Sequence, residues 1–343
     1  MHTQNIVTQV MQCCLPLMHA ARWRALRDVA VSAVNGRALS LVALALGAPR
    51  ETSVRHRVKC VDRLLGNPHL KAHRFDLYAA LARQWLTGLL PPCAQPPIVM
   101  TDAGFRNPWF RLIAAQGWQW LGRVRNRDFV KQPDAADWLP AKHLYGQARA
   151  VAADLGAYET VRNRPLRCRL VRVKHAPKGR KHCYPSGKEQ NNSTARKIAS
   201  RYREPWLLSC SPSLGHLSAE AIVRLYAQRM RIEEEFRDTK NIVLGAGLSL
   251  SRSQGQQRLQ ALLLIGHIAQ MAKRLIGEAA KDAQLHLQLM STCRRDRAEL
   301  SVMMLAKRVI DTPALLRKLK DPWPCQHDLR SQVSAAINRA MAA

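Results

Sequence analysis

The sequence predicts a mixed α+β and α/β protein, with a strand-rich middle between a helical N-terminal part and a helical C-terminal part. Three patterns support this fold class. Apolar residues recur at helical spacing up to about residue 88. Residues 167–175, RCRLVRVKH, alternate basic and apolar side chains with the period of a β-strand. Segments with helical spacing return after residue 216.

In the N-terminal part, two helices are expected on either side of a Gly-Ala-Pro turn in residues 39–70. Four cations crowd the second of these helices: Arg55, Arg57, Lys59 and Arg63. Such a pair can be a helix-turn-helix that reads DNA. An ordinary helical hairpin with a solvated basic face gives the same pattern, so both interpretations stay open.

The middle of the chain starts after a proline-rich break, LLPPCAQPP. Ile98 to Met100 are expected to form a short buried strand that ends at Thr101 and Asp102. WFRLIAAQGW then predicts a helix, and WLGRVRNRDFV predicts a strand. A strand-rich and irregular stretch follows at about residues 134–211, with EPWLLSC as a further strand near its end.

The composition points to a polyanionic partner. The 343 residues carry a formal net charge of +30, and 47% of them are hydrophobic, enough for a sizeable core in two or three compact units. Because basic residues recur along the whole chain, nucleic acid is favoured over a ribosomal-type or merely supercharged surface. Nine cysteines without a C-x-x-C spacing, and apolar runs too short to span a membrane, lead us to expect a cytoplasmic, nucleoid-associated protein.

The most informative segment is YAQRMRIEEEFRDTK, residues 226–240. At about 100° per residue, one helical stripe would hold five polar side chains: Tyr226, Arg229, Glu233, Arg237 and Lys240. A carboxylate flanked by cations suits a metal ligand beside a phosphate backbone. A charged amphipathic helix stabilised by i,i+4 pairs is the alternative, and the chemistry alone does not exclude it.

The spacing Y-(2)-R-(3)-E-(6)-K is matched here by Tyr226, Arg229, Glu233 and Lys240. It resembles the signature of the insertion-sequence transposases of family four. IVMTDAGFRNPWF followed by GWQWLGRVRNR is similar to the family's second-Asp segment, and HRVKCVDRLLGNPHL is similar to its N-terminal DNA-binding part. The resemblance extends over nearly the whole chain.

The resemblance implies an RNase H-like catalytic core in which Asp102 and Glu233 are ligands of Mg²⁺. It also implies that Tyr226, Arg229 and Lys240, with Arg237 on the same stripe, hold DNA phosphates. Trp206 is similar in place to a Trp that stacks on an extruded base, although plain core packing explains it equally well. Asp102, taken alone, could instead cap the helix that follows it.

The implied domains are a DNA-binding domain at residues 1–88, a catalytic domain at residues 96–257 that contains the strand-rich insertion, and a helical region at residues 258–343. The implied partners are double-stranded DNA, as terminal inverted repeats and target, and a second copy of the chain in the DNA complex. Cut-and-paste transposition through metal-dependent strand cleavage and transfer is the activity that the resemblance implies.

The sequence departs from the family at its first catalytic Asp. The family has this residue in a string like VDWSD on the first strand of the core sheet, and no such string occurs here. ALARQWLTG runs directly into LLPPCAQPPIVMTDAGF, which indicates an internal deletion near residues 85–90. Asp62, Asp76 and Asp128 are the nearest substitutes, and none has the right setting. Two hypotheses therefore remain: an active transposase, or a catalytically inactive remnant that only binds DNA.

Overall fold

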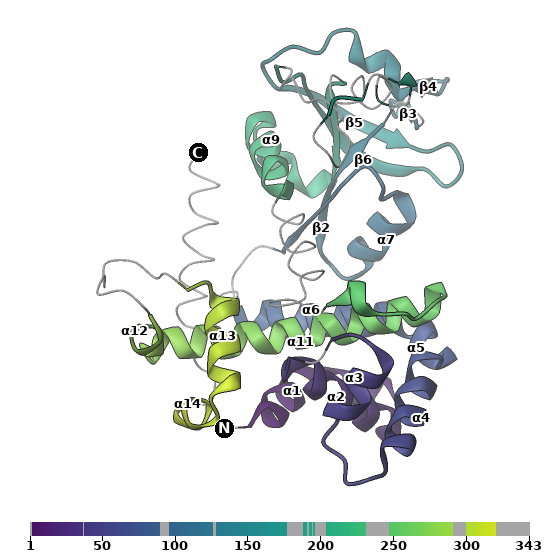
Figure 1. Ribbon diagram of the computed structural model, residues 1–343. Helices are drawn as coiled ribbons and strands as arrows, with labels where there is room; N and C mark the ends of the chain where they lie inside the picture. The colour runs from purple at the N-terminus through teal and green to yellow at the C-terminus, as the bar shows by residue number, and fades with distance from the viewer. Residues whose placement is uncertain are drawn as a thin grey trace. The chain divides into compact units, whose positions relative to one another are not determined.

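The protein is divided into two compact units, which are described separately below (Figure 1). A computed structural model describes residues 2–36, 38–89, 96–125, 128–176, 188–190, 192, 193, 195, 204–230, 247–290 and 300–319. Of the described residues, those up to 89 and from 247 onward belong to the first unit, and residues 96–230 belong to the second.

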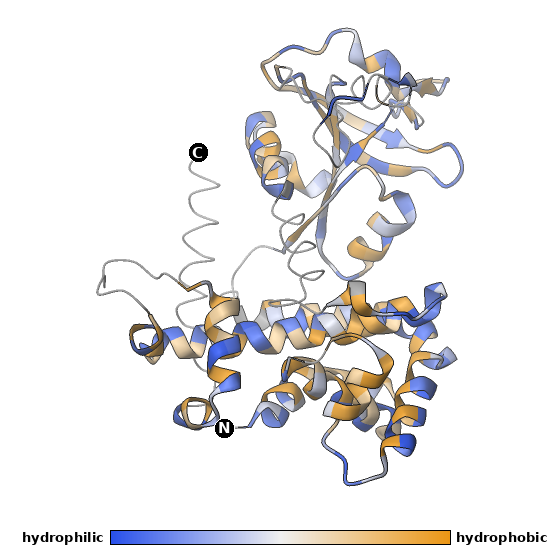
Figure 2. Ribbon diagram, viewed as in Figure 1, coloured by the Kyte–Doolittle hydropathy of each residue, from blue (hydrophilic) through white to orange (hydrophobic). Residues whose placement is uncertain are grey.

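The first unit is helical in its described part. Its elements are α1 (Thr3–Met11), η1 (Gln12–Leu17), α2 (Ala20–Val34), α3 (Leu41–Gly47), α4 (Val54–Leu65), α5 (Pro68–Ala72), α6 (Arg74–Leu89), η5 (Leu248–Leu250), α11 (Gln256–Asp282), α12 (Leu285–Leu289), α13 (Val302–Asp311) and α14 (Pro313–Lys318). The long helix α11 packs on α1, α2, α4 and α13, and one continuous apolar core joins them (Figure 2). The C-terminal helices, which we expected as a separate region from residue 258, thus share their core with the N-terminal helices.

Gly277 allows α11 and α13 to lie against each other. A Cβ atom at this position would overlap the carbonyl oxygen of Val302 at the start of α13. Any larger residue would force the two helices apart, because the obstacle is backbone and cannot rotate away.

The second unit contains a seven-stranded sheet and two covering helices (Figure 1). Its elements are β1 (Ile98–Thr101), α7 (Asn107–Ala115), β2 (Gln119–Val124), β3 (Phe129–Lys131), β4 (Leu139–Pro140), η2 (Ala141–Tyr145), β5 (Ala153–Thr160), β6 (Leu166–Val173), β7 (Trp206–Cys210), η3 (Pro212–His216), α9 (Ala219–Ala227) and η4 (Gln228–Met230). The strand order is β1-β2-β7-β6-β5-β3-β4. The pair β1 and β2 is parallel, and the other pairs are antiparallel.

Alternation along the central strands gives each face of the sheet its own core. Trp120 of β2 and Leu207 of β7 face the core that includes Phe110 of α7. Leu121 and Leu208, one residue further along the same strands, face the core that contains α9. The sheet is therefore covered by α7 on one face and by α9 on the other.

The mixed α/β class predicted from the sequence is confirmed, with corrections to individual elements. The segment predicted as one strand, WLGRVRNRDFV, forms two strands, β2 and β3. The strands between residues 134 and 211 continue the same sheet as β1 and β2. The helix expected from residue 216 is α-helical only to Ala227 and continues as 3₁₀ turn η4 to Met230, the last described residue of this segment.

No helix among the described residues is long and apolar enough to cross a membrane.

Candidate functional site

Asp102 lies at the carboxyl end of β1, where the parallel strands β1 and β2 finish at the same edge of the sheet. Its side chain is exposed, and its Oδ1 accepts a hydrogen bond from the backbone N–H of Gly104 at 2.8 Å. Within the described part of the chain this carboxylate makes no ion pair, despite the strongly basic composition. The helix-cap alternative is wrong, because the N-cap residue of α7 is Arg106, which makes no side-chain cap.

Gly122 fixes the backbone that leads into Asp102. It lies opposite Thr101 in the β1–β2 register. A Cβ atom at Gly122 would lie 2.9 Å from Thr101 Oγ1 and 2.5 Å from Cζ of Phe110. The absence of a side chain therefore allows α7 to pack directly on the strand pair whose end carries the carboxylate.

Helix α9 brings Tyr226 to this edge. Tyr226 is buried, with 3% of its surface exposed. Burial raises the pKa of its hydroxyl, and the negative charge of Asp102 raises it further. Arg229, Arg123 and Arg125 act in the opposite direction on the same pKa. Tyr226 is thus close enough to both the carboxylate and the arginines to feel their charges.

Three aromatic rings, those of His175, Trp206 and Tyr226, lie in contact with one another in a row. The rings of Trp206 and Tyr226 meet edge-on, with centroids 5.0 Å apart. The ring of His175 meets Trp206 on another side, at 4.5 Å. The guanidinium carbon of Arg229 lies 5.8 Å from the centroid of Tyr226. The structure therefore brings together three residues that the sequence singled out, Trp206, Tyr226 and Arg229, and the charge of a fourth, Asp102, acts on Tyr226. Trp206 is half-buried against the α9 core, so its role in packing or in base stacking stays a prediction.

Sequence reasoning missed two arginines of β2 and its end, Arg123 and Arg125. Arg123 Nη2 donates to the backbone carbonyls of Glu204 and Pro205 at 3.3 and 3.2 Å, and lies 3.9 Å from the Glu204 carboxylate. Burial lowers the pKa of Arg123, and the nearby Arg125 lowers it further. The period-two cations in GRVRNR were the available signal, since alternate residues of a strand face the same side.

The acidic residues considered as substitutes for the missing first Asp are engaged elsewhere. Asp62 on α4 accepts a bond from Arg258 at 2.7 Å, and Asp76 on α6 lies 3.7 Å from His73. Asp128, in the turn after β2, accepts the backbone N–H of Arg125 at 3.3 Å.

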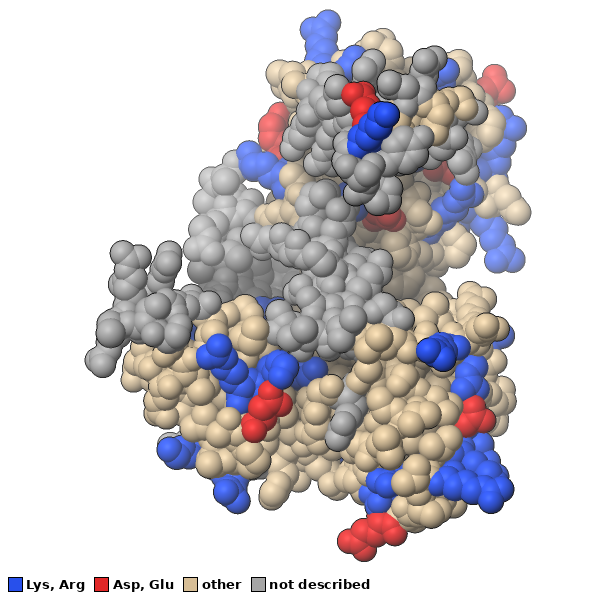
Figure 3. All heavy atoms as spheres, in the orientation of Figure 1, with Lys and Arg blue, Asp and Glu red and all other residues tan. Residues whose placement is uncertain are grey.

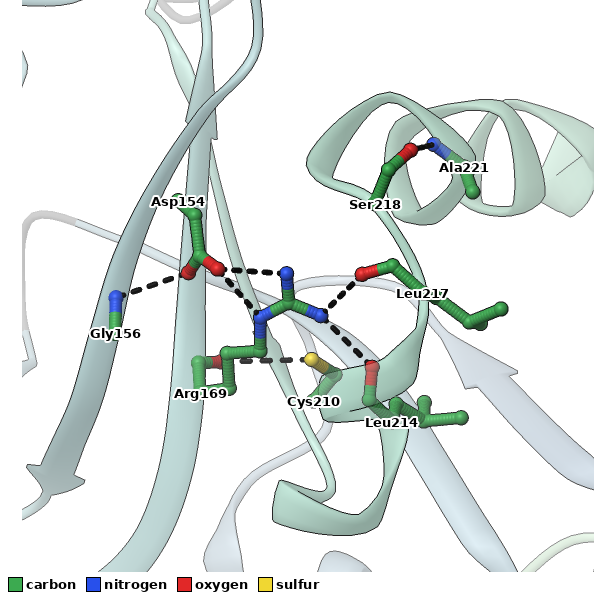
Figure 4. Close-up of polar contacts among 8 residues, drawn as sticks. All are labelled: Asp154, Gly156, Arg169, Cys210, Leu214, Leu217, Ser218 and Ala221. Atoms are coloured by element: carbon green, nitrogen blue, oxygen red, sulfur yellow. Dashed lines mark hydrogen bonds and ion pairs between the residues drawn. The ribbon is translucent and has the colours of Figure 1, made fainter.

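An arginine clamp fixes the start of α9 (Figure 4). Arg169 of β6 donates from Nη1 to the carbonyl oxygens of Leu214 and Leu217, each at 2.7 Å. From Nε and Nη2 it donates to Asp154 Oδ2 at 3.1 and 2.7 Å. Asp154 sits in a β-bulge of β5, where Gly156 has a positive φ of 79° and donates to Asp154 Oδ1.

The clamp explains the orientation of α9. One guanidinium joins β5, β6 and the last residues before the helix, and Ser218 then caps α9 by accepting from Ala221 N at 3.1 Å. The hydrogen bond and charge of Arg169 hold the pKa of Asp154 below its usual range. Tyr226 and Arg229 follow Ser218 by 8 and 11 residues, about two and three turns, so the clamp determines where they reach the sheet edge.

The predicted DNA-reading helix is α4 of the helical unit. Ser53 caps it by accepting from His56 N at 3.3 Å. Three of its cations are exposed and free of ion pairs among the described residues: Arg55, Lys59 and Arg63. Arg57 is half-buried and donates to the Leu46 carbonyl of α3 at 3.3 Å, so it holds the two helices together. Figure 3 shows Lys and Arg side chains gathered over the part of this unit where α4 lies.

Glu233, Arg237 and Lys240 lie outside the described residues, so their predicted roles stay predictions. Among the residues that are described, no group of three His, Cys, Asp or Glu side chains could hold a metal ion.

A comparison with protein families finds a match. The family model described as "Transposase DDE domain" matches residues 79–270, which is more than half of the chain. A comparison with curated protein sequences finds no match.

Proposed function

Because this chain belongs to the DDE transposase family, we propose that it is a family-four insertion-sequence transposase that binds the terminal inverted repeats of its element. Its proposed chemistry is metal-dependent cleavage of the DNA strand at the element's end, followed by transfer to target DNA. The observation that carries the proposal is the exposed Asp102 at the end of β1, which has no ion pair among the described residues and whose charge acts on Tyr226. Tyr226 in turn contacts Trp206 and Arg229.

The donor atoms at this edge fit a divalent ion. Oxygen of a carboxylate is the ligand that Mg²⁺ prefers, and one oxygen of Asp102 is left open by its bond to Gly104. We assign Asp102 and Glu233 as the ligands. When bound, Mg²⁺ would polarise the phosphoryl group and lower the pKa of the attacking water.

The protein's own part is to hold the strand and to balance its charge. Arg229 and Arg125 carry cations whose charges act on Tyr226, and Arg–phosphate pairs give both charge and directional hydrogen bonds. Arg123 is less available for DNA because backbone carbonyls and Glu204 already occupy it. Trp206 would supply a stacking surface beside them.

Recognition of the repeats is assigned to α4. Its exposed stripe of three cations supplies phosphate contacts, and residues of the same face would reach the major groove. The family further implies a homodimer on paired ends and a cytoplasmic, nucleoid-associated location.

One observation favours the second candidate, a DNA-binding remnant without catalysis. In the described part of the chain, β1 pairs only with β2 and forms the end of the strand order. If an RNase H-like core had lost its leading strands by an internal deletion, the strand that carries Asp102 would become the outermost strand of the sheet in this way. The sequence also lacks a first catalytic Asp, and two-metal phosphoryl chemistry needs carboxylates on both flanks of the ions.

The test uses the purified full chain and duplexes taken from the DNA that flanks its gene. Mobility shifts at several salt concentrations measure binding, and 3′ nicking in Mg²⁺ measures catalysis. We expect binding to the element's end in preference to unrelated DNA, and binding without nicking would select the DNA-binding remnant. Robust nicking that D102N abolishes would select the active enzyme, and equal binding to unrelated duplexes would contradict the proposed recognition.

A further inference from the structure

An aromatic pair with one exposed ring lies at the start of α7 and has no part in the function proposed above. Phe105 is 44% exposed, although its ring is large and apolar. Its centroid lies 5.3 Å from that of the half-buried Trp109, with the ring planes tilted by 44°. Trp109 packs into the core on the α7 face of the sheet. The Phe105 ring therefore packs against Trp109 and still leaves much of its surface exposed to solvent.

A tight turn joins this ring to the proposed metal ligand. The backbone N–H of Phe105 donates to the Asp102 carbonyl at 3.4 Å, and that of Gly104 donates to Asp102 Oδ1 at 2.8 Å. A Cβ atom at Gly104 would lie 3.0 Å from Asp102 Oδ1, so the turn leaves little room for a side chain there. The first and last Cα atoms of such a turn lie within about 7 Å of each other. The turn therefore keeps the backbone of Phe105 within about 7 Å of the backbone of Asp102.

The charges beside the ring suit nucleic acid. Arg106 follows Phe105 in an extended conformation, is exposed, and makes no ion pair among the described residues. A cation for the phosphate and an aromatic face for the base are the two parts of a site that binds unpaired nucleotides. A paired base inside a duplex is already covered on both faces, so the ring fits a base that has left its pair.

We propose that Phe105, supported by Trp109, stacks on the unpaired nucleobase next to the phosphate that is placed at Asp102. Arg106 binds the phosphate on the other side of that nucleotide. The inference rests on the proposed function, since it requires an element end at this edge, and it names the contact that holds the end open.

The test is a double-mutant cycle in which one change is made in the protein and the other in the DNA. The probes are duplexes from the flanking DNA with a short single-stranded end, in which one terminal nucleotide at a time is replaced by an abasic one. Binding of the full chain is measured in Ca²⁺. For one terminal position, we expect the abasic change to weaken wild-type binding about tenfold. We expect F105A to weaken binding to the intact probe by a similar factor. Because both changes remove the same contact, the two together should cause little additional loss of affinity.

Two variants separate stacking from folding. F105Y keeps an aromatic face and should retain wild-type affinity. L112A removes another exposed apolar side chain of α7, 40% exposed, and should leave both probes unaffected. If the wild-type chain prefers the flanking DNA but F105A binds as tightly, or if its loss is the same at every abasic position, the stacking proposal is wrong. If the wild-type chain shows no preference for the flanking DNA, the proposed function itself fails.

Discussion

Replacing Arg169 by Met removes the clamp while keeping most of the apolar stem. The carbonyl oxygen of Leu214 is buried, and losing its donor costs about 1–3 kcal/mol. The carbonyl of Leu217 is partly buried, so its loss adds about 1 kcal/mol. The Asp154 carboxylate is 46% exposed, and solvent reduces its pair with Arg169 to roughly 0–1 kcal/mol. We therefore expect R169M to lower the free energy of unfolding by about 3 kcal/mol.

The measurement is urea and thermal unfolding of the full chain, followed by tryptophan fluorescence and circular dichroism. For a unit of this size, 3 kcal/mol corresponds to a fall in Tm of roughly 10 °C. The matched control is R167M, two residues earlier on β6, whose side chain is 79% exposed and only 3.9 Å from Glu159. We expect R167M to lower the free energy of unfolding by less than about 0.5 kcal/mol. A loss below 1 kcal/mol for R169M would refute the claim that this guanidinium holds α9 in place.

The same bond predicts a pH dependence. Because the hydrogen bond from Arg169 lowers the pKa of Asp154 in the folded protein, the ionised carboxylate stabilises the fold. This contribution is present above the unfolded-state pKa, about 3.9, and is lost as the pH falls through the lower folded-state value. In D154N this part of the acid sensitivity should disappear, whereas an unchanged acid limb would show that the carboxylate does not couple to folding.

Two further predictions concern the sheet edge and the DNA-reading helix. G122A should destabilise the sheet unit by about 1–3 kcal/mol, because the added methyl meets Phe110 at 2.5 Å, whereas G146A, with open space around its Cβ, should change urea unfolding little. The second prediction concerns the three exposed cations of α4, Arg55, Lys59 and Arg63. Replacing all three by Ala should reduce the steepness of the plot of log affinity against log salt by about 2–3 in a mobility-shift titration, because each phosphate contact contributes about 0.9. The control is R317A/K318A on α14, and an equal change in slope for this pair would show that the effect reflects net charge alone.

Local patterns predicted the described strands well. RCRLVRVKH and EPWLLSC form β6 and β7, and beyond their first residues both strands are buried on both faces. The break between β2 and β3 was missed, since RVRNRDFV carries no glycine or proline to mark it. The order of the strands and the continuity of the sheet depend on long-range pairing, which periodicity does not contain.

The site could be predicted in part. The family resemblance gave Asp102, Tyr226, Arg229 and Trp206. In the structure the last three lie in contact, and the charge of Asp102 acts on Tyr226. The clamp could not be predicted, because Arg169 acts through backbone carbonyls 45 and 48 residues further along the chain. Hydrogen bonds to backbone leave no signature in residue types, so a buried Arg in a basic strand looks the same as a solvated one.

The central claim is that Asp102 and Glu233 hold the same divalent ion, and Mn²⁺ binding to the full chain tests it most directly. Affinity is measured by electron paramagnetic resonance for the wild type, D102N, E233Q and the double variant, with D128N as the control. We predict that each single change weakens binding at least about tenfold and that the double variant is little weaker than either, because both remove one shared site. Single variants that bind Mn²⁺ as the wild type does, or losses that multiply as for independent sites, would contradict the account.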